Sequence, residues 1–125
     1  MLKGFVHHTI LISVVIMSMM FIYSSMTIFL MPGWSDQFAV WGYSQLFLYL
    51  IGSIELTIAV AVFAKPTRVY GLMGLIVIMI GALYTHLTND QPDEIYAAIF
   101  MLFLAISTLT LIWFKDKIDK GKIVN

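Results

Sequence analysis

The stretch Ile51-Gly52-Ser53-Ile54-Glu55-Leu56 places a single carboxylate in the middle of an apolar run that extends from Tyr43 to Ala64. A run of this length can cross a bilayer, and a charge near its centre costs about 2.5 to 3.5 kcal/mol of insertion free energy. On a helical wheel, the small residues Gly52 and Ala59 fall within about 60° of Glu55. Because membrane helices approach each other through small residues, we expect Glu55 to point into the protein interior and away from lipid.

The composition is typical of an integral membrane protein. Of the 125 residues, 61% are hydrophobic and 11% are charged, whereas soluble domains are about 45 to 50% apolar and about 25% charged. The net charge is zero, and we expect the lipid bilayer as a partner and no nucleic acid. Cysteine is absent, which excludes disulfides, thiol redox chemistry and thiolate-held metal or iron–sulfur sites within this chain.

The hydropathy pattern predicts four membrane helices, over residues 9–31, 43–64, 70–87 and 95–114. Pro32–Gln37 is interpreted as a turn, because Pro and Gly both interrupt helices and an Asp needs water. The spans use up the length, so we expect one membrane domain over residues 1–125. Its predicted fold is an all-α, up-down-up-down four-helix transmembrane bundle, followed by a charged cytoplasmic tail at residues 115–125.

The distribution of positive charge predicts the orientation of the chain. The basic residues lie at the amino terminus, in the second turn or in the tail: Lys3, Lys65, Arg68, Lys115, Lys117, Lys120 and Lys122. The first and third turns carry acidic residues and no basic ones. The positive-inside rule then places both termini and the second turn in the cytoplasm.

Helix rise converts sequence position into depth within the bilayer. Glu55 lies about 14 Å from the inner edge, near the midplane, and His86 lies about 24 Å from the same edge, so no direct ion pair between them is expected. Ser18 is level with Glu55, while Ser25 and Tyr96 are level with His86. We therefore predict a polar funnel that opens outward through His86, Ser25 and Tyr96, with Glu55 at its floor.

Each of these residues also has a purely structural interpretation. An isolated acid inside a membrane usually marks an ion, proton or ligand site, but Glu55 can instead be a hydrogen-bonded contact between helices. His86 can equally be an interfacial residue that bonds Thr88 or lipid headgroups. The methionines are interpreted as gap-filling core residues, and no metal site is predicted. No nucleophile triad, phosphate-binding loop or carboxylate pair is present, so hydrolytic chemistry has no support.

Three segments resemble, in order and spacing, the pattern of the DoxX-like membrane proteins. They are Trp41-Gly42-Tyr43-Ser44, then residues 51–56, then Gly81-Ala82-Leu83-Tyr84-Thr85-His86-Leu87. The resemblance implies a four-helix bundle in the bacterial inner membrane. It also implies a link to quinone-coupled oxidation, because the family takes its name from a membrane subunit of a thiosulfate:quinone oxidoreductase. The chain departs from many relatives in having no basic residue near the outer end of the first helix.

The leading hypothesis is a membrane subunit of an oxidoreductase system that binds a small ligand, with a quinone headgroup as the candidate and no intrinsic cofactor. Glu55 is the candidate proton carrier. The candidate ligand-binding residues are Ser18, Ser25, Gly52, Tyr84, Thr85, His86 and Tyr96. One alternative is a non-catalytic interaction or assembly factor, which docks another membrane protein, a redox subunit or a second copy of itself. A third hypothesis is the transport of a small solute or of protons.

Overall fold

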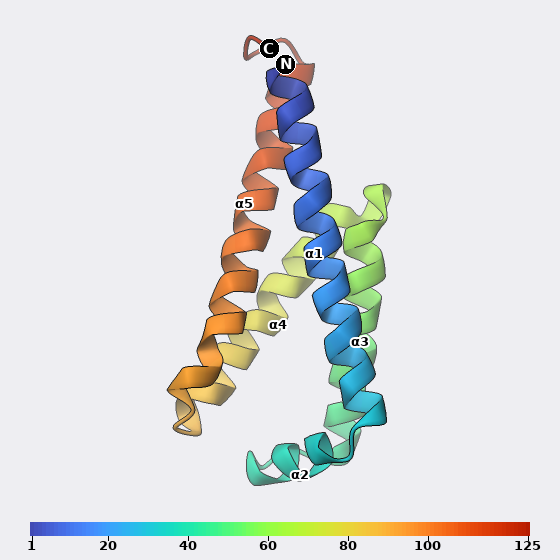
Figure 1. The fold of residues 1–125 in the computed structure, drawn as a ribbon, viewed down its shortest axis with the longest axis vertical. Coiled ribbons are helices and arrows are strands. Elements are labelled where there is room, and N and C mark those ends of the chain that lie inside the picture. Colours follow the sequence, from blue (N-terminus) through green and yellow to red (C-terminus); the bar gives the residue numbers. More distant parts are fainter.

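The computed structural model describes all of residues 1–125, and its regular structure is entirely helical. The five α-helices are α1 (Leu2–Leu30), α2 (Gly33–Val40), α3 (Gln45–Phe63), α4 (Arg68–Thr88) and α5 (Ile95–Asp119), with short 3-10 helices at Lys65–Thr67 and Pro92–Glu94. The helices that are long and apolar enough to cross a membrane are α1, α3, α4 and α5. They run in alternating directions, and both termini lie together at one end, here called the termini end (Figure 1). The predicted all-α, four-helix membrane bundle is confirmed.

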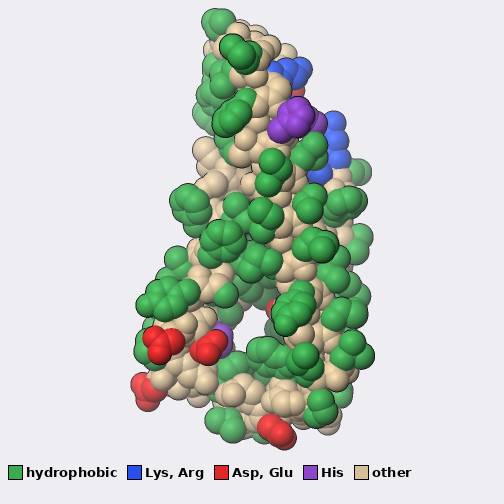
Figure 2. Space-filling model, viewed as in Figure 1, with side chains coloured by type: hydrophobic (Ala, Val, Ile, Leu, Met, Phe, Trp, Pro, Cys, Tyr) green, Lys and Arg blue, Asp and Glu red, His purple; other side chains and the backbone are tan.

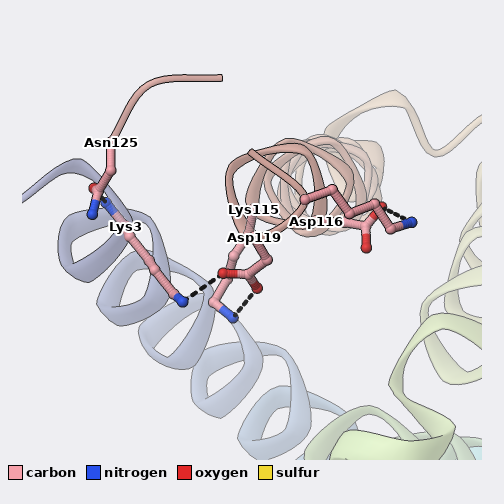
Figure 3. Close-up of polar contacts among 6 residues, drawn as sticks. Lys3, Lys115, Asp116, Asp119 and Asn125 are labelled. Atoms are coloured by element: carbon pink, nitrogen blue, oxygen red, sulfur yellow. Dashed lines mark hydrogen bonds and ion pairs between the residues drawn. The ribbon is translucent and has the colours of Figure 1, made fainter. Parts of the chain in front are cut away.

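The long helices differ from the predicted spans mainly at the termini end. Helix α1 begins at Leu2, and α5 continues through the first part of the predicted charged tail. Lys115 and Asp119 form an ion pair one helical turn apart, and Asp119 also pairs with Lys3 of α1 (Figure 3). Lys120 pairs with Asp116 in the same way. Such ion pairs stabilise a helix beyond its apolar span, and a hydropathy profile does not detect them.

The prediction of a turn at Pro32–Gln37 is wrong, because this segment begins a helix. Helix α2 lies across the end of the bundle opposite the termini, here called the α2 end (Figure 1). Pro32 has a helical φ of −61°, and Asp36 lies in the first turn, where a carboxylate meets the positive end of the helix dipole. Gly42 then has a positive φ of 83° that turns the chain into α3.

Glycines determine where the long helices touch. A Cβ at Gly71 of α4 would lie 2.7 Å from the backbone nitrogen of Val62 in α3, and a Cβ at Gly52 of α3 would lie 2.8 Å from the Ile28 side chain of α1. Helix α3 therefore packs against α4 toward the termini end and against α1 toward the α2 end. Farther along α4, a Cβ at Gly81 would meet nothing within 4 Å, so α3 and α4 separate toward the α2 end.

The hydrophobic core lies in the part of the bundle where all four long helices are together. Its largest cluster of buried residues comprises Val6, Ile10, Val14, Met17, Phe21, Ile58, Ala59, Val62, Leu72, Leu75, Met79, Ala98, Met101 and Ala105. Toward the α2 end the helices pack as two pairs, α1 with α3 and α4 with α5 (Figure 1). The space between the two pairs contains the candidate site.

Candidate functional site

A cavity of about 530 Å³ lies between the two helix pairs near the α2 end. The space-filling view shows it as an opening through the molecule above α2 (Figure 2). Residues from every α-helix line it, and most of them are hydrophobic. The lining residues with polar groups are Ser24, Trp34, Trp41, Tyr43, Glu55, Tyr84, Thr85, His86 and Glu94. An apolar cavity with a few polar groups is the usual form of a small-molecule site.

Glu55 lies in the middle of α3 and lines this cavity. Its side chain is buried, with 6% of the residue exposed, and its Oε2 atom has no hydrogen-bond partner. Ser24 of α1 is the side chain that approaches the carboxyl group, and it lines the same cavity from the neighbouring helix of the same pair. Because buried polar groups in folded proteins are nearly always paired, the unpaired oxygen leaves the Glu55 carboxyl short of one hydrogen bond at the cavity wall.

An aromatic cluster covers the α2 end of the cavity and is here called the lid. It consists of Trp34, Phe38, Trp41, Tyr43 and Phe47. Phe38 is at its centre, with ring centroids at 5.3 Å from Trp41 and 5.7 Å from Tyr43. Trp and Tyr favour the membrane interface, because each joins an apolar ring to a polar group.

Hydrogen bonds connect the lid to the opposite helix pair. The Tyr43 hydroxyl lies 2.8 Å from the Thr85 hydroxyl of α4. The side-chain carbonyl of Gln91 accepts a hydrogen bond of 3.1 Å from Trp41 Nε1, and His86 Nδ1 lies 3.1 Å from the same oxygen. Since a carbonyl oxygen only accepts, His86 Nδ1 carries the hydrogen in this arrangement. The two helix pairs are thus joined again beyond the cavity.

The sequence profile of the DoxX-like family matches residues 11–108. The chain belongs to the DoxX-like family. The matched range includes Glu55, His86 and most of the cavity lining. No curated protein and no solved structure matches the chain.

The structure brings together four of the candidate residues of this DoxX-like protein. Glu55, Tyr84, Thr85 and His86 all line the cavity. Thr85 is buried and contacts the lid through Tyr43, whereas Tyr84 lies at the cavity border with 66% of its surface exposed. No group of three or more His, Cys, Asp or Glu side chains lies close enough to hold a metal ion.

The other four candidate residues lie outside the cavity lining. The Ser18 hydroxyl donates to the backbone carbonyl of Ala59, and the Ser25 hydroxyl donates to the carbonyl of Gly52, so both serines join α1 to α3. Gly52 itself is packed against α1. Tyr96 is 68% exposed on α5. The end of the bundle where the outward opening was predicted is instead crossed by α2 and the lid.

Sequence reasoning missed Ser24 and the lid as parts of this site. Ser24 and Ser25 are adjacent, and only the rotation of α1 against α3 decides which of them faces the cavity. Trp34, Trp41 and Tyr43 are residue types that are typical of a membrane interface, and residue type alone does not indicate that they line a cavity. The sequence signal for the lid is the density of rings around Trp41 and Tyr43.

The two serines give a matched test of this rotation. Ser25→Ala removes a buried hydrogen bond between α1 and α3 and should lower the free energy of unfolding by about 1 kcal/mol. Ser24→Ala removes no hydrogen bond to the backbone of another helix and should change the free energy of unfolding by less than about 0.5 kcal/mol. Unfolding in detergent, followed by circular dichroism, measures both values. Equal losses in the two variants would contradict the placement of α1.

Proposed function

We propose that this DoxX-like protein is a membrane subunit of an oxidoreductase system that binds a quinone-class ligand in the cavity, with Glu55 as proton carrier. The observation that supports this most is the buried Glu55 carboxyl, whose Oε2 has no partner, at the border of an apolar cavity. The cavity volume of about 530 Å³ is within the range of known small-molecule sites, which extends from about 300 to 1,000 Å³.

The residues around the cavity fit a quinone headgroup. A protonated Glu55 can donate a hydrogen bond to a ring carbonyl, and the Ser24 hydroxyl lies beside this carboxyl and lines the same cavity. The aromatic faces of the lid, with Phe38 and Tyr43 nearest its centre, suit stacking against a flat ring. No other acid has a comparable position, because Glu94 is exposed at the beginning of α5.

When bound, a quinone would supply two-electron, two-proton redox chemistry, with its electrons exchanged with a partner redox protein. In this proposal Glu55 holds one exchangeable proton, and Ser24 orients the carboxyl. The lid limits the access of water from the α2 end. His86 and Glu94 line both the cavity and an outer groove of about 310 Å³, and they provide the route for protons toward the surface.

Native mass spectrometry of the protein, purified in mild detergent, tests this proposal. The expected result is a co-purified isoprenoid quinone at a stoichiometry near one per chain, which Glu55→Leu removes. A stoichiometric protein partner with no bound isoprenoid would contradict the proposal and favour the interaction or assembly role. Recording lipids and proteins in the same preparation distinguishes the two results.

We also propose a bacterial inner-membrane location with both termini in the cytoplasm. Figure 2 shows the basic side chains in the half of the molecule that holds the termini and most acidic side chains at the α2 end. This asymmetry, which the positive-inside rule relates to orientation, supports the proposal.

Because the chain has no cysteine, single introduced thiols can test this orientation. Val124→Cys and Asp93→Cys lie at opposite ends and leave all basic residues in place. In intact spheroplasts a membrane-impermeant maleimide should label Cys at position 93 and spare Cys at position 124. The reverse labelling pattern would contradict the orientation, and labelling after lysis controls for reactivity.

A further inference from the structure

We infer that the ligand carries a hydrocarbon chain and reaches the cavity sideways from the bilayer, through a window between α3 and α4. This inference rests on the proposed ligand-binding function and adds the route by which the ligand enters. The window is the stretch where α3 and α4 lose contact, bordered by Phe47 and Ile51 on α3 and by Val77, Gly81 and Tyr84 on α4.

Contacts close the window at both ends. On the side of the termini, a Cβ at Gly74 would lie 3.3 Å from the Ile58 side chain, so the helices still touch there. At the α2 end, the hydrogen bond between Tyr43 and Thr85 joins them again. The stretch of α4 between Gly74 and Thr85 rises about 16 Å. A Cβ at Gly81, inside this stretch, would meet open space.

The α4 border of the window faces both the cavity and the surroundings. Val77 is 67% exposed and Tyr84 is 66% exposed, yet both also line the cavity. With Gly81 they follow helical spacing on one face of α4. A helix face that is exposed at membrane depth contacts acyl chains, and this one is largely apolar. It therefore suits an alkyl or prenyl chain that extends from the cavity into the bilayer.

The two other routes fit a hydrocarbon chain less well. The lid closes the α2 end and is held by the Gln91 side chain. On the side between α1 and α5, the cavity border includes Ser24 and the exposed Glu94. A carboxylate at that border favours water over acyl chains. The window between α3 and α4 has no exposed carboxylate, because Glu55 on α3 is buried, so we assign the hydrocarbon chain to this window.

Stopped-flow fluorescence tests the window. The protein is placed in nanodiscs of phosphatidylethanolamine and phosphatidylglycerol, and a decyl-substituted benzoquinone is delivered from vesicles of the same lipids. Quenching of the cavity tryptophans, Trp34 and Trp41, reports binding. Gly81→Leu should narrow the window and slow association and dissociation by about tenfold. Gly4→Leu, at a helical glycine that also has open space but lies away from the cavity, should leave both rates unchanged.

The remaining outcomes separate this inference from the proposed function. Saturable quenching in the wild type with unchanged rates in Gly81→Leu would overturn the window alone. Absence of saturable quenching in the wild type would overturn the window and the ligand-binding function together. Faster association in Gln91→Ala would assign the route to the lid. Slower association in Ala97→Leu, with unchanged rates in Gly81→Leu, would assign it to the side between α1 and α5. If Gly81→Leu lowers thermal stability, Val77→Trp at the same border replaces it.

Discussion

Gly71→Leu should lower the free energy of unfolding by at least about 3 kcal/mol, which would be the largest stability effect of any single change considered for this chain. A Cβ at this position would lie 2.7 Å from Val62 N and 2.9 Å from Ala61 C. Both are backbone atoms, which cannot rotate away as the end of a side chain can. Helices α3 and α4 would have to separate where they now pack most closely.

Gly81→Leu is the matched control on the same helix, because a Cβ there would meet nothing within 4 Å. Leucine also has a better intrinsic helix propensity than glycine, by somewhat less than about 1 kcal/mol. The control should therefore be as stable as the wild type or slightly more stable. Thermal and denaturant unfolding in detergent, followed by circular dichroism, compares the variants. Similar losses of stability in Gly71→Leu and Gly81→Leu would show that α3 and α4 do not converge as described.

Glu55→Leu should abolish saturable quinone binding and stabilise the fold by about 1 to 3 kcal/mol. The buried carboxyl has an oxygen without a partner, so an apolar side chain of similar size removes a polar burial cost. The same change removes the only acid that both lines the cavity and lies in the middle of a helix. A gain in stability combined with a loss of binding is typical of a site maintained for function.

Glu55→Gln separates hydrogen bonding from proton exchange at this position. The amide keeps the shape and can still donate a hydrogen bond, so binding should fall by less than about tenfold. It cannot titrate, so the proton exchange that accompanies reduction of the bound quinone should be lost. Quinone-linked activity equal to that of the wild type in a correctly folded Glu55→Gln protein would contradict the proton-carrier role. A large destabilisation by Glu55→Leu would instead indicate that the carboxyl joins helices.

The sequence predicted the parts of this fold that depend on hydropathy and on residue size. Four long apolar runs specify four membrane helices, and the small residues near Glu55 correctly predicted that it is buried. Small residues repeat along one face of α4, a pattern that favours close helix contact, and such contact is present at Gly71 and Gly74. At Gly81 the same pattern borders the cavity, because contact also depends on the angle between helices, which composition does not encode.

Helix α2 and the lid could not be predicted from the same rules. Pro32 and Gly33 read as helix breakers, although proline is also favoured at the beginning of a helix, where its missing N–H has no partner to lose. The candidate site was predicted only in part for a related reason. Depth along a helix follows from residue number, and it correctly excluded a direct contact between Glu55 and His86. The rotation of α1 about its axis decides whether Ser24 or Ser25 faces the cavity, and residue number does not give this rotation.

Steady-state fluorescence of tryptophan variants tests whether the cavity beside Glu55 binds a quinone. Trp34 and Trp41 line the cavity, whereas Trp113 lies on α5 outside it and is 59% exposed. Trp113→Phe retains only the two cavity tryptophans, and the double variant Trp34→Phe, Trp41→Phe retains only Trp113 as a control for quinone dissolved in the bilayer. With decyl-substituted benzoquinone in nanodiscs, we predict saturable quenching in Trp113→Phe, loss of this quenching when Glu55→Leu is added, and only linear quenching of Trp113. Linear quenching of equal strength at all three tryptophans would contradict it.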